Sequence, residues 1–194
     1  MSLIAECLRQ PRMIVSVMGP HAGEAADGIF KRKAKDIERI GWTLWVIRSQ
    51  GASAEMVQRM YSSGGPLYAV FIEPAVSGGA LPTKTIEGAR EYSPDRLTWS
   101  SLPQGLGPVT GKMSRTTCAL WFDRLEVLDG VTRLDLWTYA DHARPGIPAR
   151  TKIGHSTICV TRGDTSQHDL RMKSRYRRIV AAARLKAPGA VWLR

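Results

Sequence analysis

Three residues of this chain have side chains and positions that could support acid–base chemistry. Asp141 and His142 are adjacent and precede a Pro-Gly loop, and a carboxylate beside an imidazole can orient it as a catalytic base. A turn with a solvent-exposed Asp–His pair explains the same two residues equally well. His155 stands at the start of a predicted strand. We therefore predict His155, His142 and Asp141 as candidate catalytic residues, and the alternative of an ordinary turn stays open.

The tripeptide His155-Ser156-Thr157 resembles one of the His-x-Thr motifs of the two-histidine phosphoesterases. That family needs two such motifs, in which one histidine acts as base and the other as acid. No other histidine of this sequence is followed by Ser or Thr two residues on. The resemblance therefore assigns no role to any residue.

Sequence signatures of metal and cofactor sites are absent. The motifs GxSxG, HExxH and CxxC do not occur, and the three cysteines are widely spaced. Asp123 and Glu126 could be metal ligands in a nuclease, but their odd spacing on a predicted strand directs them to opposite faces. We expect no metal, no cofactor and reduced thiols.

Charge is the strongest feature of the composition. The chain has 28 Lys and Arg against 17 Asp and Glu, a formal net charge of +11, which attracts polyanions such as nucleic acid. No acidic residue follows Asp169, and eight basic residues lie between Arg171 and Arg194. On a helix, Arg171, Arg175 and Arg178 would form a row that suits a phosphate backbone. A solvated helix face in a basic protein is the alternative.

We therefore predict a nucleic-acid-binding protein, held to phosphates by a basic C-terminal helix, by a second basic helix and by basic loops. Arg48 follows a predicted central strand, at the position where open α/β sheets bind ligands. Trp99 lies in a polar loop and could stack on a base, whereas most other tryptophans lie in predicted strands and are expected in the core. The predicted contact residues are Arg171, Lys173, Arg175, Arg177, Arg178, Arg184, Lys186, Lys31, Arg32, Lys35, Arg48, Trp99, Arg144, Arg150 and Lys152.

These residues would be positioned by a single α/β or α+β domain, residues 1–194, with a mixed sheet. Apolar periodicity predicts the order β-α-β-α-β from residue 12 to 74, with parallel crossovers. Residues 75–113 form a long Gly/Pro-rich excursion with one predicted helix, Lys84 to Tyr92. Asp129-Gly130 predicts an antiparallel hairpin, and residues 165–187 predict the basic C-terminal helix.

The segment from Gly41 to Pro74 contains an aromatic strand, Arg-Ser, a Met-rich helix, a Gly turn and an apolar strand. That order is similar to a segment of PUA-like domains, the EVE type included, which bind modified bases. The resemblance favours nucleic-acid binding and assigns no residue.

Location and partners follow from what the sequence contains. No uncharged apolar run of 18 residues is present, and the N-terminal residues lack a signal layout, so we expect a cytoplasmic protein without a membrane partner. Two other functions stay open. One is an enzyme acting on nucleic acid or a phosphorylated small molecule at a His155/His142 site. The other is an assembly or inhibitor protein whose basic helix docks an acidic protein partner.

Overall fold

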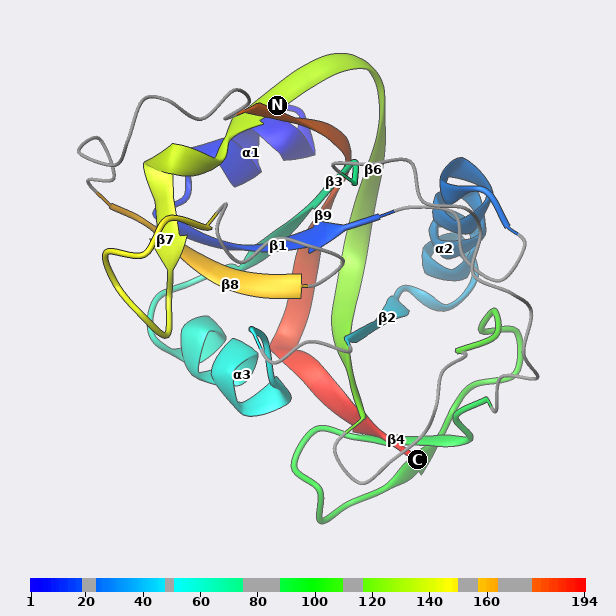
Figure 1. Cartoon of the computed structure of the whole chain (residues 1–194). Helices are drawn as coiled ribbons and strands as arrows, with labels where there is room; N and C mark the ends of the chain where they lie inside the picture. The colour runs from blue at the N-terminus through cyan, green and yellow to red at the C-terminus, as the bar shows by residue number, and fades with distance from the viewer. Residues whose placement is uncertain (19–23, 48–50, 75–87, 110–116, 150–156, 164–175) are drawn as a thin grey trace.

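The computed structural model describes residues 1–18, 24–47, 51–74, 88–109, 117–149, 157–163 and 176–194, and these form a mixed α+β arrangement in which strands predominate (Figure 1). The helices are α1 (Leu3–Arg9), α2 (Ala26–Ile40), α3 (Ala54–Ser62) and the 3-10 helix η1 (Leu136–Thr138). The strands are β1 (Arg12–Val17), β2 (Thr43–Ile47), β3 (Tyr68–Ile72), β4 (Glu91–Ser93), β5 (Ser100–Ser101), β6 (Cys118–Asp135), β7 (Tyr139–Asp141), β8 (Thr157–Arg162) and β9 (Tyr176–Leu193).

One curled mixed sheet joins these strands in the order β2-β6-β9-β3-β1-β8-β7. β1 and β3 run parallel, and the other neighbours in that order run antiparallel. β4 pairs with β9 and with β5. The curl brings the segment after β2 against β8, where the backbone N–H of Cys159 donates to the carbonyl of Gly51 at 3.1 Å. Residues far apart in the strand order therefore become neighbours.

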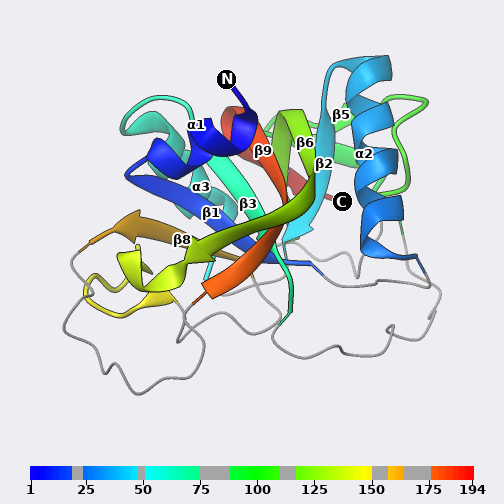
Figure 2. The same cartoon turned by 90° about the horizontal axis from the view of Figure 1, so that it is seen from above.

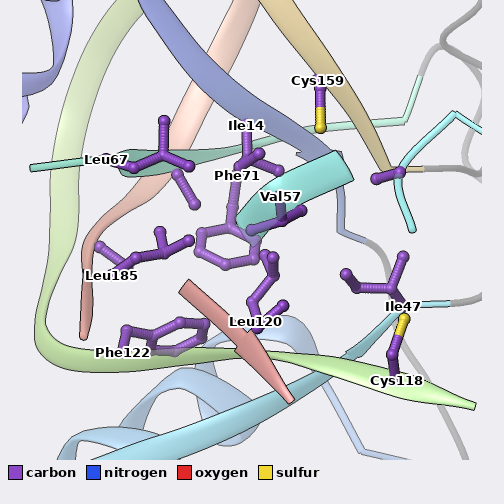
Figure 3. Close-up of a cluster of buried hydrophobic side chains, with 14 of the residues drawn as sticks. Ile14, Ile47, Val57, Leu67, Phe71, Cys118, Leu120, Phe122, Cys159 and Leu185 are labelled. Carbon is purple, nitrogen blue, oxygen red and sulfur yellow. The ribbon is translucent and has the colours of Figure 1, made fainter. Parts of the chain in front are cut away.

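Helices cover both faces of the sheet around β1 and β3. Figure 1 shows α1 and α3 on opposite sides of β1, and Figure 2 shows α2 alongside β2. One core cluster packs under α2 and α3, and Figure 3 shows Phe71, Leu120 and Phe122 directed into it. A second cluster packs under α1, and a third lies between β2, β6, β9 and the segment 88–109. The five residues of β3 are all buried, as expected for a strand covered on both sides.

The first five predicted elements after α1 form in the predicted chain order. Ser53 is the N-cap of α3, and its side chain accepts from the N–H of Met56, as a serine at this position commonly does. α2 ends at Gly41, whose φ of 81° suits a glycine at this position. The start of α3 and the end of α2 therefore coincide with local sequence signals.

The predicted parallel crossovers are only partly formed. β1 and β3 are parallel neighbours, but β2 lies at the far end of the strand order and pairs antiparallel with β6. The apolar pattern of residues 43–47 predicts a central strand. β2 is instead covered by α2 and by residues 88–109, and side-chain patterns do not say which strand is the neighbour.

The prediction of a C-terminal helix is wrong for residues 176–187, which belong to β9; residues 165–175 lie outside the described part of the chain. β9 is central, between β3 and β6, and the run Ile179 to Ala183 is buried apart from the half-buried Val180. Short apolar runs suit a buried strand and a helix equally, so pairing with two distant strands overrides the helical propensity of alanine and arginine.

The predicted hairpin at Asp129-Gly130 is also wrong. β6 continues through both residues and pairs with β9 on either side of them. Val127 is opposite Ala181 and Thr132 is opposite Ile179, so residues 128–131 form a bulge. Gly130 has a φ of 117°, a conformation that serves a bulge as well as a tight turn, and this explains the misreading.

Part of the Gly/Pro-rich excursion is ordered against the third core cluster. Within residues 88–109, Ala89, Tyr92, Leu102, Leu106 and Val109 contact that cluster. The predicted helix Lys84 to Tyr92 does not extend into its described residues, because Glu91–Ser93 is strand β4. In the described part of the chain no helix has the length and apolar character needed to cross a membrane.

Candidate functional site

The carboxyl ends of the two parallel strands meet at one edge of the sheet. Val17 is opposite Ile72, and the N–H of Met18 donates to the carbonyl of Ile72 at 2.9 Å. Thr157, the first residue of β8, is opposite Ser16. We call Ser16–Met18, Gly51, Ile72–Pro74 and Thr157 the carboxyl edge; in open α/β sheets, ligands bind at such positions.

Close packing fixes the carboxyl edge. The hydroxyls of Ser16 and Thr157 are buried and lie 2.7 Å apart, so they share a hydrogen bond between β1 and β8. A Cβ atom on Gly51 would lie 2.7 Å from Ile158 Cγ2 and 3.1 Å from the carbonyl oxygen of Thr157. A side chain larger than hydrogen therefore does not fit at residue 51 without a shift of β8.

An exposed arginine stands beside the end of β3. Arg178 donates from Nη1 to Glu73 Oε1 at 2.7 Å, and its carbonyl accepts from the N–H of Glu73. Arg133 of β6 is directly opposite Arg178, and both side chains are exposed. Two like charges facing each other across a strand pair are unfavourable unless an anion joins them. Sequence reasoning missed Arg133, because only the pairing of β6 with β9 brings it to Arg178.

The predicted acid–base residues lie in a turn that follows β7. Asp141 is buried; its Oδ1 accepts from the N–H of Ala143 at 2.9 Å, and its Oδ2 lies 3.3 Å from Arg144 Nη2. The backbone N–H of His142 donates to the carbonyl of Cys159 at 3.0 Å. Both carboxylate oxygens are thus used inside the turn, and the described contacts do not include one between Asp141 and the His142 ring. His155 lies outside the described residues.

Several predicted contact residues of β9 make contacts within the protein. Arg184 forms a two-pronged ion pair with Asp123, at 2.9 and 3.0 Å, and this partner raises the pKa of the guanidinium. The ammonium of Lys186 lies 5.4 Å from the centroid of the Trp121 ring. Arg177 is half-buried and opposite Leu134, on the other face of the strand from Arg178.

The basic side chains of the predicted basic helix α2 lie in three different environments. Lys31 and Lys35 are exposed, and Arg32 pairs with Glu24 at 2.9 Å. Lys33 was not predicted as a site residue and is buried with Asp36; burial lowers its pKa to about 8. Helix α2 therefore has exposed lysines on one side and a buried Lys33–Asp36 ion pair on another.

Trp99 is half-buried and held in place. Its indole N–H donates to the carbonyl of Arg96 at 3.2 Å, and the guanidinium of Arg194 lies 4.2 Å from the ring centroid. Arg194 in turn pairs with Glu91 at 2.6 Å. One face of the ring is thus covered by the protein's own arginine.

Seven predicted residues lie outside the described part of the chain: Arg48, Arg150, Lys152, His155, Arg171, Lys173 and Arg175. Four of them belong to the stretches 48–50 and 150–156, each of which adjoins a carboxyl-edge residue at one end only. Gly51 ends the gap that contains Arg48, and Thr157 ends the gap that contains Arg150, Lys152 and His155. The gap that contains Arg171–Arg175 is flanked by Gly163 and Tyr176, which are not edge residues.

The cysteines are poor nucleophiles. All three are buried, which raises the pKa of Cys7 and Cys159 to about 12 and of Cys118 to about 11. Figure 3 shows Cys118 beside Ile47. Among the described residues there is also no group of three or more His, Cys, Asp or Glu side chains that could hold a metal ion.

Comparison with protein-family models, with curated proteins and with solved structures found no match for this chain. The chain is a mixed α+β protein with one curled mixed sheet.

Proposed function

We propose that this protein binds nucleic acid and that the carboxyl edge is its main contact surface. One observation supports this most: the carboxyl ends of β1 and β3 and the first residue of β8 meet beside Gly51, and in the sequence Arg48 comes shortly before Gly51, and Arg150 and Lys152 shortly before Thr157. Strand ends that meet at one edge are where α/β sheets hold phosphorylated ligands.

The charge balance agrees with a polyanionic ligand. Each internal ion pair, such as Arg184–Asp123, joins one positive and one negative side chain and so leaves the net charge of +11 unchanged. A field of this sign speeds the encounter with a polyanion. Arginine suits the task because its guanidinium can donate two parallel hydrogen bonds to a phosphate.

Further contacts are proposed on either side of the edge. Arg144 and Arg178 are exposed and partly neutralised by Asp141 and Glu73, so a phosphate could share them. Arg171, Lys173 and Arg175 complete the contact set from the C-terminal basic stretch. Neutralising five to eight phosphates would give a log–log salt slope of about −4 to −7. A cytoplasmic location is part of the same proposal.

The test is fluorescence anisotropy of the purified protein against labelled single-stranded and duplex DNA and RNA, repeated across a salt series. The proposal expects saturable binding with a steep negative salt slope. The triple variant Arg171→Ala, Arg175→Ala, Arg178→Ala should bind more weakly and with a flatter slope. Flat curves for every nucleic acid at low salt would overturn the proposal.

A further inference from the structure

Three aromatic rings form a cluster that the carboxyl edge does not use. Trp42 precedes β2, Tyr92 is in β4 and Trp121 is in β6. The ring centroids of Trp42 and Trp121 are 5.4 Å apart, those of Trp42 and Tyr92 5.5 Å, and those of Tyr92 and Trp121 5.8 Å. All three side chains are only partly buried. Trp42 and Ile47 are at opposite ends of β2, about 17 Å apart at about 3.4 Å per residue, and the edge residue Gly51 follows Ile47 in the sequence.

The rings do not stack face to face on one another. Their planes are inclined at 56°, 79° and 63°, so each ring contacts its neighbours largely through an edge. The ammonium of Lys186 lies over the Trp121 ring at 5.4 Å. One face of the Trp121 ring is therefore covered by the protein's own lysine, as one face of Trp99 is covered by Arg194.

The cluster also contains an unsatisfied donor. Trp121 Nε1 is buried and has no hydrogen-bond partner among the described residues. A buried donor without an acceptor costs about 1–3 kcal/mol, and such atoms are rare in native proteins. All three rings pack against the third core cluster and keep part of their surface exposed, so the aromatic cluster lies at the boundary between core and surface.

The chemistry of the cluster restricts that group. Partly exposed rings favour a flat aromatic partner, whereas Lys186 and the net charge of +11 disfavour a cation and favour an anion. A nucleotide joins both properties, because it has a flat base and an adjoining phosphate. Bases inside a duplex have no free faces, whereas those of a single strand can stack on aromatic side chains.

We infer that Trp42 and Tyr92 stack unpaired bases of a single-stranded nucleic acid, with Lys186, which lies over Trp121, at the adjoining phosphate. This inference rests on the proposed function and adds its strand preference. A strand of 12 nucleotides is about 40 Å long at 3.4 Å per nucleotide, more than twice the length of β2.

The experiment compares a labelled 12-nucleotide oligothymidine with an abasic strand of the same length and charge. One stacked base contributes about 1–3 kcal/mol, so the wild type should bind the base-bearing strand about fivefold or more tightly. Trp42→Leu keeps an apolar side chain and removes the π face, so it should reduce this preference and leave abasic binding unchanged. Tyr92→Leu should do the same and serves if Trp42→Leu fails to fold.

Trp137→Leu, a partly buried tryptophan of η1, is the matched control and should keep the wild-type preference. Equal wild-type binding of the two strands would overturn the stacking inference and leave the proposed function in place. Absence of binding to either strand would overturn both. A preference that survives Trp42→Leu and Tyr92→Leu would also overturn the inference.

Discussion

Lys33 Nζ lies 3.9 Å from Asp36 Oδ2 on helix α2, and both side chains are buried. Asp36 also contacts residues outside this pair. Its Oδ2 accepts from the Thr43 hydroxyl at 2.9 Å, and its Oδ1 accepts from the N–H of Gly107 at 2.9 Å. Arg39 lies 3.3 Å from the same carboxylate. One carboxylate therefore connects α2, β2 and the segment 102–109 that covers the third core cluster.

Replacing the carboxylate should be costly. Asp36→Asn removes the charge that faces Lys33, and breaking a buried ion pair by changing one partner costs about 3–5 kcal/mol. We expect a loss of about 3 kcal/mol in the free energy of unfolding, measured by urea denaturation. Glu38→Gln, at an exposed position of the same helix, is the control and should change stability by less than about 0.5 kcal/mol. A similar small effect for both variants would contradict the role of Asp36.

Lys33 should give stability a specific pH dependence. Burial lowers the Lys33 pKa from 10.5 to about 8, so between these values the unfolded chain keeps a proton that the folded protein has lost. Stability then rises with pH across that window, by roughly 3 kcal/mol. The measurement is the difference in urea stability between wild type and Lys33→Met at pH 7.5 and at pH 10. Parallel profiles of the two proteins would show that Lys33 does not titrate in this way.

The buried thiols should make stability fall as the pH rises, opposite to the effect of Lys33. Their pKa values rise from 9.0 to about 11 or 12 on folding, so above pH 9 the unfolded chain loses protons that the folded protein keeps, and stability falls. At pH 8 the native thiols should react with iodoacetamide on the order of a hundredfold or more slowly than in urea. Native labelling at the rate of a free cysteine would contradict their burial.

Gly51 should tolerate no side chain. In Gly51→Ala the new Cβ would meet Ile158 and the Thr157 carbonyl, and overpacking of this kind costs about 1–3 kcal/mol. Gly163→Ala is the matched control, because a Cβ there has no atom within 4 Å and the residue has an ordinary φ. We expect a lower thermal midpoint for Gly51→Ala and little change for Gly163→Ala. Equal midpoints would mean that the carboxyl edge is loosely packed.

Sequence reasoning identified the local features of this fold and missed those that depend on distant pairing. The Ser53 cap of α3 and the glycine that ends α2 depend only on neighbouring residues. The helix predicted over residues 165–187 failed in its described part, because β3 and β6 are the partners that make β9 a strand. The hairpin failed for a related reason, since Gly130 suits either a turn or a bulge.

The residues of the candidate site also depend on which distant strands pair. Arg48 was expected to follow a central strand, but β2 lies at the end of the strand order and pairs antiparallel with β6, and Arg48 itself lies outside the described residues. The pair Arg133–Arg178 could not be predicted, because the residues are distant in sequence and meet only through the β6–β9 register. The Trp42–Tyr92–Trp121 cluster likewise requires three separate strands to be placed.

The central claim is that nucleic acid contacts the carboxyl edge, and a pair of charge-matched variants tests it most directly. Arg150→Gln/Lys152→Gln removes two charges from the segment that leads into Thr157. Arg9→Gln/Arg59→Gln removes two exposed charges from the last turns of α1 and α3. The edge variant should bind a labelled single strand about tenfold or more weakly, with a log–log salt slope flatter by about 1.4–1.8, and the control should bind like wild type. Equal weakening of both variants, or of neither, would contradict the claim.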